Sequence, residues 1–387
     1  MSEMSYLEKL LDGVEVEWKT LGSIAELKRG TSITKKDVID GTIPVVAGGR
    51  TPAYYHNTSN RDGQTIVIAG SGAYAGFVSW WEEPIFVSDA FTVKPHNILL
   101  PRYCYHFLMN MQQQLHEFKS GGGVPHVYPR DVSPILIPIP CPDNPEKSLA
   151  IQSEIVRILD KFTALTAELT AELNMRKKQY NYYRDQLLSL EEDEIEWKAL
   201  DDVCALISAG GDVPENSVKG QVKPTNEYPY PIYANATDEK GLYGYTDSYK
   251  IDSDAVTISA RGAKVGYHTV RDAKFTPIIR LIVLVANKNL VRTRYLNYVL
   301  DMTAIGGTDG GIPQLTVPMV KKITVPIPFA SNPNRSLAEQ DRIIAILDKF
   351  EILTNSINEG LPREINLRQK QYEYYRDLLL SFPKSNV

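Results

Sequence analysis

The side chains best placed to do chemistry are basic residues concentrated in two short stretches, one in each half of the chain. Residues 28–61 contain six Lys and Arg against two Asp, a net charge of +4, and residues 261–280 contain five against one, also +4. Lys and Arg neutralise phosphates, and Arg also pairs with the edge of guanine through two parallel hydrogen bonds. Most charged stretches in proteins are simply solvated surface. For these two stretches, the charge by itself therefore favours neither DNA contact nor a solvated surface.

Two Glu-Trp-Lys segments, at residues 17–19 and 196–198, resemble the end of a metal-dependent nuclease motif. Such a site also needs an aspartate on a neighbouring strand. Asp12 is too close in sequence, and the spacing around Asp193 differs. The alternative is that each segment begins a strand and places a buried Trp between surface charges. We favour the strand, and a standalone magnesium-dependent nuclease remains the enzymatic alternative.

Glycine-rich turns offer a second kind of site. Gly70-Ser-Gly72, followed by Gly76, resembles a fragment of a dinucleotide or S-adenosylmethionine loop, but a lone G-x-G is a weak signal. The corresponding segment of the second half, residues 260–262, lacks the first glycine. The sequence has no Walker A motif and no Asn-Pro-Pro-aromatic motif of amino methyltransferases. These glycines are interpreted as tight turns that bring the backbone close to a ligand or are purely structural.

Histidines and cysteines show no pattern of a metal or nucleophile site. The six histidines are scattered without a His-Glu-x-x-His motif, and the three cysteines lack Cys-x-x-Cys spacing. An odd number of cysteines disfavours a disulfide framework and suits a reducing cytoplasm. We therefore expect no catalytic residue and no metal ligand in this chain.

Length and composition are those of an ordinary globular protein. The chain has 387 residues, of which 43% are hydrophobic and 23% charged. At about 100–200 residues per domain, this length predicts two or three domains. No basic segment leads into an apolar run near the start, and no apolar stretch reaches the ~20 residues that span a bilayer. We expect a cytoplasmic protein with no membrane contact. The net charge of −5 counts against nucleic-acid binding unless the basic stretches act locally.

An internal repeat organises the sequence. Residues 158–162 and 346–350 are both Ile-Leu-Asp-Lys-Phe, and residues 178–185 closely match residues 370–377. Shorter matches link residues 17–19, 68–73, 122–125 and 137–140 with residues 196–198, 258–263, 310–313 and 325–328. The copies diverge most between these segments, which favours one scaffold carrying two different reading surfaces; drift after gene duplication is the alternative. Residues 6–11 resemble residues 183–188, so we expect the two termini to lie close together.

The most similar segments predict long helices. Asn144 and Pro145 supply a cap and a first-turn proline, and apolar residues then recur every three or four positions to residue 189. Such a helix is about 65 Å long and is typical of a coiled-coil arm. The second copy is predicted to begin at Ser336, with Glu339 completing a capping box, and to break at Gly360-Leu-Pro362. We expect the two helices to pair antiparallel.

The remaining segments, residues 14–143 and 195–333, contain β-rich runs bounded by Gly, Asn, Asp and Pro, with short helices at 103–118 and 294–302. We predict an α/β (α+β) fold with two tandem pseudo-symmetric domains that have mixed β-sheets and are separated by two long antiparallel coiled-coil helices. The predicted divisions are residues 1–144, 145–190, 191–334 and 335–387.

The repeat, its Glu-Trp-Lys starts and its Ile/Val-Pro-Ile-Pro ends resemble the specificity subunit of type I restriction-modification systems over the whole chain. The tandem Thr166-Ala-Glu-Leu169 and Thr170-Ala-Glu-Leu173 is similar to the type IC group in particular. The resemblance implies two target recognition domains, 1–144 and 191–334, each reading one half of a split, asymmetric DNA sequence. Residues 145–190 and 335–387 would be the conserved spacer helices.

The resemblance further implies that the spacer helices bind two modification (methyltransferase) subunits, which use S-adenosylmethionine to methylate adenine N6 and flip the base out. Two restriction subunits, which use ATP and Mg²⁺, join that complex, while this chain contributes no cofactor and no catalytic residue. One four-residue unit lengthens a helix by ~6 Å, comparable to one or two base pairs at ~3.4 Å each. With two units we predict a spacer of about six base pairs, a family-based value set against that rise.

The residues that we expect to contact DNA are chosen by residue type, loop position and repeat equivalence. They are Lys28, Arg29, Lys35, Arg50, Ser71 and Tyr74 in the first half and Arg261, Lys264, Tyr267, Thr308 and Gln314 in the second. The expected spacer and partner-binding residues are Phe162, Leu169, Leu173, Tyr180, Tyr183, Phe350, Tyr372 and Tyr375. A coiled-coil scaffold with no role on DNA is the third alternative. The target bases do not follow from the sequence.

Overall fold

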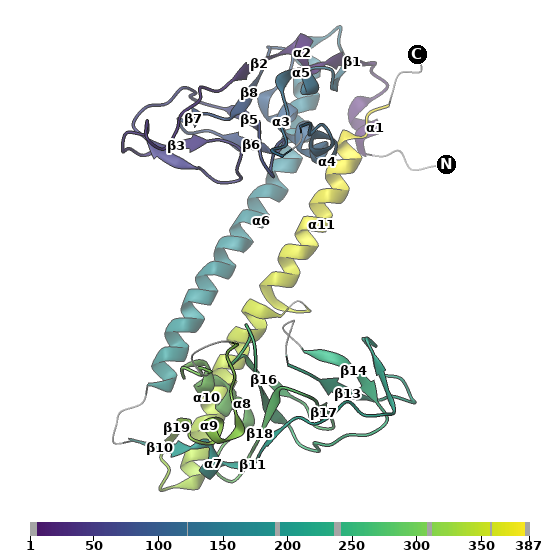
Figure 1. Ribbon diagram of the computed structural model, residues 1–387. Helices are drawn as coiled ribbons and strands as arrows, with labels where there is room; N and C mark the ends of the chain where they lie inside the picture. The colour runs from purple at the N-terminus through teal and green to yellow at the C-terminus, as the bar shows by residue number, and fades with distance from the viewer. Residues whose placement is uncertain are drawn as a thin grey trace. The chain divides into compact units, whose positions relative to one another are not determined.

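The computed structural model describes residues 6–121, 123–189, 194–235, 241–307, 312–356 and 358–383. The chain forms two compact units. Unit 1 contains Met1–Thr170 together with Glu364–Val387, and unit 2 contains Ala171–Arg363. Each unit therefore combines one α/β domain with parts of both helical segments, and the long helix α6 (Pro145–Leu188) belongs to both units (Figure 1).

Unit 1 holds three small sheets. The first is antiparallel with strand order β2-β8-β5-β6, the second has the order β4-β3-β7 with β3 and β7 parallel, and β1 pairs with β9 alone. Its elements are α1 (Tyr6–Leu11), β1 (Val16–Thr20), α2 (Leu21–Ile24), β2 (Ala25–Arg29), β3 (Ile43–Val46), β4 (Tyr54–His56), β5 (Thr65–Ala69), β6 (Val78–Trp81), β7 (Phe86–Val87), β8 (Ala90–Pro95), α3 (Pro101–Asn110), α4 (Gln112–Glu117), α5 (Pro129–Val132), β9 (Leu136–Pro140) and all but the first turn of α11 (Gly360–Leu380).

Unit 2 repeats this plan with sheets β11-β18-β15-β16, β12-β14-β13-β17 and β10-β19. Its elements are β10 (Ile195–Ala199), α7 (Leu200–Val203), β11 (Cys204–Ala209), β12 (Ser217–Lys219), β13 (Tyr230–Tyr233), β14 (Leu242–Thr246), β15 (Ala255–Ser259), β16 (His268–Arg271), β17 (Thr276–Pro277), β18 (Leu281–Ala286), α8 (Thr293–Asp301), α9 (Val317–Lys321), β19 (Thr324–Pro328) and α10 (Pro333–Asn355). The mixed sheets predicted for both halves are confirmed.

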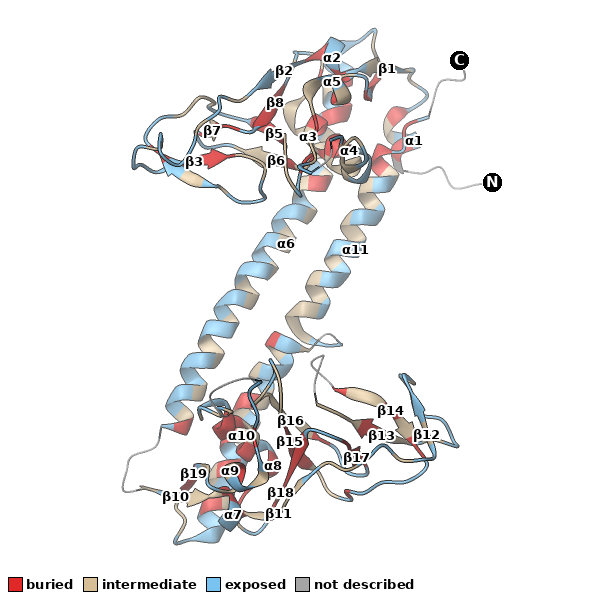
Figure 2. Ribbon diagram, viewed as in Figure 1, coloured by how far each residue is buried: buried red, intermediate tan, exposed pale blue. Residues whose placement is uncertain are grey.

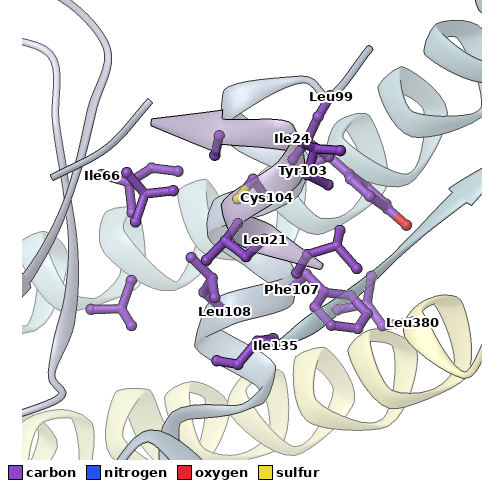
Figure 3. Close-up of a cluster of buried hydrophobic side chains, with 14 of the residues drawn as sticks. Leu21, Ile24, Ile66, Leu99, Tyr103, Cys104, Phe107, Leu108, Ile135 and Leu380 are labelled. Atoms are coloured by element: carbon purple, nitrogen blue, oxygen red, sulfur yellow. The ribbon is translucent and has the colours of Figure 1, made fainter. Parts of the chain in front are cut away.

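The core of each unit lies where one short helix packs on the four-stranded sheet and the spacer helix. In unit 1, Tyr103 of α3 is fully buried in the same hydrophobic cluster as Leu21 and Ile66 (Figure 3). Its hydroxyl donates to the carbonyl of Pro138 at 3.1 Å. In unit 2, Tyr295 of α8 does the same to Pro326 at 3.0 Å. The strands β9 and β19 are Pro-rich, which two-stranded ribbons tolerate because proline removes only edge hydrogen bonds.

Both ends of the described chain contribute to one core. Leu7 and Leu11 of α1 lie in the same buried cluster as Leu379, Leu380 and Phe382. The Trp18 indole also donates to the carbonyl of Pro383 at 3.0 Å. The prediction that the two terminal segments lie together is confirmed.

The long helix predicted from residue 145 is continuous, and Asn144 caps it by accepting from the Lys147 N–H at 3.0 Å. Residues 160–187, all of them described, contain no buried residue, and the pale colour along the middle of α6 in Figure 2 reflects this. Among the residues described, no helix combines the length and apolarity that crossing a membrane requires.

The second helical copy begins earlier than predicted and breaks close to the predicted place. It begins at Pro333, not Ser336, because Asn332 caps it by accepting from the Arg335 N–H at 3.2 Å, and Ser336 is buried inside the helix. The break is confirmed, but it precedes Gly360, which adopts a φ of 72°. Pro362 lies in the first turn of α11, where its missing N–H costs nothing.

A buried polar contact ties α3 to α6 in unit 1. The His106 ring is almost fully buried, its Nε2 donates to the Asp160 carboxylate at 2.7 Å, and Arg102 donates to the same oxygen at 2.8 Å. Within the described ranges, His106 Nδ1 has no hydrogen-bond partner. Burial lowers the pKa of His106, against the opposing effect of Asp160. A proton added at Nδ1 would be buried without an acceptor, so the neutral ring is favoured.

Unit 1 should therefore lose stability as the pH falls through the ordinary histidine range, near 6.5. The unfolded chain binds this proton at a higher pH than the folded chain does, so the contribution of neutral His106 is complete at higher pH and lost on acidification. Thermal unfolding between pH 7.5 and 5 would show the loss, and the variant His106→Gln should show a smaller one. Equal slopes for the two proteins would contradict this assignment.

Candidate nucleic-acid interface

The clearest candidate surface in unit 1 is the loop that follows β5. Gly70 donates to the carbonyl of Asp89 at 3.1 Å, and its own carbonyl accepts from the Val127 N–H at 3.0 Å. Gly72 then donates to the carbonyl of Pro125 at 2.9 Å, and Ser71 pairs with His126 as an antiparallel bridge. Three segments far apart in sequence therefore meet at the end of one strand.

Unit 2 builds the same loop bond for bond after β15. Ala260 donates to the carbonyl of Arg280 at 2.9 Å and accepts from the Leu315 N–H at 2.8 Å. Gly262 donates to the carbonyl of Pro313 at 3.1 Å, and Arg261 is bridged to Gln314. This correspondence makes Ser71, Asp89 and His126 the structural equivalents of Arg261, Arg280 and Gln314.

The glycines of these loops have different roles. Gly76 has a φ of 84°, and a Cβ atom there would lie 2.6 Å from the carbonyl oxygen of Leu115. A Cβ atom at Gly266 would likewise lie 2.5 Å from the carbonyl oxygen of Ile305. These two glycines allow a close approach of the backbone, to α4 in unit 1 and to the segment that follows α8 in unit 2. Gly72 and Gly262 also have positive φ, but the space beside them is open.

Of the residues predicted to contact DNA in the first half, some lie at this loop and others do not. The Arg50 guanidinium lies over the exposed ring of Tyr74 at 4.8 Å, and Ser71 is hydrogen-bonded to the carboxylate of Asp89. Arg29 lies over Tyr128 at 5.2 Å and lines a hollow of about 510 Å³ with Asp89 and His126. The other two, Lys28 and Lys35, are exposed, and within the described ranges no contact of their side chains ties them to this loop.

In the second half, Arg261 and Lys264 line a hollow of about 560 Å³ together with Arg280 and Asn235. Gln314 and Arg261 line a neighbouring one of about 300 Å³. Tyr267 is half-buried at the end of the turn. Thr308 lies outside the described residues, so the structure says nothing of it.

Several residues of these surfaces were missed by sequence reasoning. Asp89, His126, Tyr128 and Arg130 belong to the first, where Arg130 lies over the Tyr128 ring at 4.8 Å. Arg280 and Asn235 belong to the second. The matched Gly-Gly-x-Pro segments were an available signal, because His126 and Gln314 follow them directly.

Not every basic residue in the two +4 stretches faces solvent. Arg61 donates to the carbonyls of Asn60 and Arg29 and to the Thr92 hydroxyl, so it links strands. Arg271 is buried, with its guanidinium 3.9 Å from the centre of the Tyr233 ring. These two arginines make contacts inside the protein. The positively charged surface is therefore smaller than the net charge of +4 in each stretch indicates.

The Glu-Trp-Lys segments form the strands β1 and β10. Lys19 pairs with Glu17 at 3.0 Å, and Lys198 pairs with Glu196 at 3.3 Å. In the parts of the chain that the structure describes, no three His, Cys, Asp or Glu residues gather as a metal site would require. The geometry matches the strand interpretation. Trp197, however, is 60% exposed, so the expectation of a buried Trp is wrong there.

The predicted spacer residues form aromatic pairs within each unit. In unit 1, Phe162 of α6 stacks on Tyr375 of α11 with ring centroids 5.3 Å apart. In unit 2, Phe350 of α10 stacks on Tyr183 of α6 at 5.7 Å and contacts Tyr180 at 6.4 Å. The remaining predicted positions, Leu169, Leu173 and Tyr372, are half-buried.

Beside the second pair lies a groove of about 930 Å³ lined by Arg176, Gln179, Gln186, Arg342 and Ile346. Burial raises the pKa of Tyr180 to about 12, so its phenol remains neutral at physiological pH. The groove is lined by both polar and apolar side chains, a mixture that protein contact sites share.

Loss of Arg261 and Lys264 tests the second surface. In a complex with the subunits that the resemblance implies, the double variant Arg261→Ala/Lys264→Ala should bind the target duplex at least about tenfold more weakly. Lys288→Ala is the matched control, since Lys288 pairs with Asp254 and follows the opposite end of β18. Unchanged binding of the double variant, measured by gel shift at fixed salt, would remove both residues from the interface.

Comparison with known proteins gives concordant matches. The family model of the type I restriction modification DNA specificity domain matches residues 13–176 and again residues 192–367. The EcoR124I/EcoR124II type I restriction enzyme specificity subunit of Escherichia coli is 38% identical, with 99% of this chain and 98% of that protein covered. The EcoprrI specificity subunit, also from Escherichia coli, is 33% identical, with 93% of each covered.

Solved structures share the fold. The S subunit of a type I restriction-modification system from M. genitalium matches with a TM-score of 0.66 and 16% identity, covering 96% of this chain and 98% of that one. A chain from a study of complex assembly and conformational transition of the type I R-M system matches with a TM-score of 0.53 and 17% identity, covering 95% and 98%.

Proposed function

Since the chain belongs to the specificity subunits of type I restriction-modification systems, and so serves sequence-specific DNA recognition, we propose that each of its two α/β domains reads one half of a split, asymmetric target. The observation that carries this proposal is the pair of equivalent loops after β5 and β15. Their backbone hydrogen bonds correspond one to one, while the side chains they present differ. One scaffold with two different surfaces fits a target with two unlike halves.

We propose that the helical segments bind two modification (methyltransferase) subunits and, through them, two restriction subunits. The repeated aromatic pairs, Phe162–Tyr375 and Tyr183–Phe350, support two equivalent sites, one in each unit. S-Adenosylmethionine would be held by the modification subunits, and ATP and Mg²⁺ by the restriction subunits. The complex would act in the cytoplasm, where the chromosomal DNA lies.

Two alternatives have less support. A standalone nuclease would need a metal site at the Glu-Trp-Lys segments, whose charged side chains instead pair with each other. A scaffold without a role on DNA does not explain why the two loops differ most in their charged side chains. Magnesium-dependent cleavage by the purified chain alone would favour the first, and failure of the assembled complex to shift any duplex would favour the second.

The proposal is tested by co-expressing the chain with its modification subunits and mapping methylated adenines across the host genome. We expect one bipartite motif with about six non-specific base pairs between its halves, set by the length of the spacer helix. Replacing residues 14–143 with the corresponding segment of another specificity subunit should change one half of the motif only. A change in both halves would contradict a one-domain, one-half-site division.

A further inference from the structure

At three equivalent positions the two units carry net charges of opposite sign. In unit 1 they are Ser71, Asp89 and His126, a net charge of −1 with the histidine neutral; in unit 2 they are Arg261, Arg280 and Gln314, a net charge of +2. The backbone bonds that place them are the same within a few tenths of an ångström. The difference of three charges therefore lies in the side chains and not in the scaffold.

Both sets open onto hollows of the surface. Asp89 is exposed and lines the unit 1 hollow with His126, and Arg261 lines both hollows of unit 2 with Arg280. Among the described residues, no ion pair holds the side chain of Arg261 or Arg280, whereas most other arginines in this unit are engaged. Two guanidinium groups that line one hollow without a carboxylate partner are favoured where an anionic or acceptor-rich ligand binds there.

An exposed aspartate in a DNA-binding loop needs a different explanation, because a carboxylate facing phosphates is repelled. A carboxylate is favourable against the amino groups of cytosine N4 or adenine N6, and it cannot approach guanine O6 and N7, which are both acceptors. Ser71 donates a hydrogen bond to Asp89 and so orients the carboxylate. Arginine has the reverse preference, since its fork matches O6 and N7 of guanine.

We propose, on the basis of the DNA-reading function above, that these three positions are the base-discriminating set of each domain. Asp89 selects a base that presents an amino group in the first half-site, cytosine or adenine. Arg261 and Arg280 select guanine in the second, and Gln314 reads a neighbouring adenine through N6 and N7. The net charge of this set of three positions thus decides which class of base each domain accepts.

The experiment uses the complex of this chain with its modification subunits and a duplex library in which both half-sites are randomised. The most discriminating variant is Arg261→Lys, which keeps the positive charge but loses the planar guanidinium that can donate two parallel hydrogen bonds. It should lower the preference for guanine at one base pair of the second half-site about tenfold, with the first half-site and the non-specific affinity unchanged. Asp89→Asn should relax one base pair of the first half-site by a similar factor, with the second unchanged.

The outcomes separate this proposal from the one it rests on. A wild-type complex that selects no bipartite sequence overturns both. A wild-type complex that is selective, with variants that keep every base preference or lose affinity equally for all sequences, overturns the assignment of these positions and leaves the domain function intact. Lys288→Ala, which removes a cation that is paired with Asp254, is the control and should leave both half-sites unchanged.

Discussion

Replacement of Gln152 by Leu is expected to destabilise unit 1 by roughly 2–5 kcal/mol, because it leaves two backbone groups buried without partners. Gln152 of α6 is fully buried; its amide donates to the carbonyl of Ile98 at 3.0 Å and accepts from the Leu100 N–H at 2.8 Å. Leucine has nearly the same volume, so no cavity accounts for the loss.

The second unit contains the same device. Gln340 of α10 is fully buried, donates to the carbonyl of Leu290 at 3.0 Å and accepts from the Arg292 N–H at 2.8 Å. In both copies the amide also donates to a serine hydroxyl one turn earlier, Ser148 or Ser336. Each spacer helix is thus fastened to the loop that leads into the short core helix, α3 or α8.

Hydrogen exchange measured by mass spectrometry on the full chain checks the prediction unit by unit. Gln152→Leu should accelerate exchange in α3 and its preceding loop and leave α8 unaffected, whereas Gln340→Leu should do the reverse. The two variants are therefore controls for each other. Uniform acceleration throughout the chain, or none, would contradict the view that each glutamine stabilises its own unit.

The repeat and its helices could be predicted from the sequence because their signals are local. Asn144-Pro145 identifies the start of α6, and the same Asn-Pro pair at Asn332-Pro333 starts α10. At the second site a Ser-x-x-Glu pattern suggested a later start, but Ser336 is buried against Gln340 and cannot cap. Two local signals competed, and tertiary packing decided between them.

The base-facing positions depend on non-local contacts, and for this reason sequence reasoning found only some of them. Ser71, Arg261 and Gln314 were predicted as DNA contacts from residue type and loop position. Asp89 and Arg280 were not, because they reach the loops only through the pairing of β5 with β8 and of β15 with β18. The same limit explains Arg61 and Arg271, which a charge count treats as surface cations and the fold uses internally.

Insertion of a third Thr-Ala-Glu-Leu unit after residue 173 is expected to change the spacing of the DNA target while leaving both half-sites as they are. The two Thr-Ala-Glu-Leu repeats lie within the part of α6 that contains no buried residue. The boundary between structural units 1 and 2 also falls there, between Thr170 and Ala171. Neither core is therefore disturbed. Four residues add ~6 Å to the helix and rotate it by only ~40° beyond a full turn. The apolar residues after the insertion therefore stay on nearly the same side of the helix as those before it.

The ~6 Å of added helix corresponds to one or two base pairs at ~3.4 Å each. Methylome mapping should therefore show a DNA spacer that is longer by one or two base pairs. Deleting residues 170–173 should shorten it by the same step. A single alanine inserted at the same point is the control, because it turns the stripe by ~100° and should reduce methylation at every spacing. If the four-residue insertion left the spacer unchanged, the helix would not measure the distance between the half-sites, and the separation would have to be set by the partner subunits.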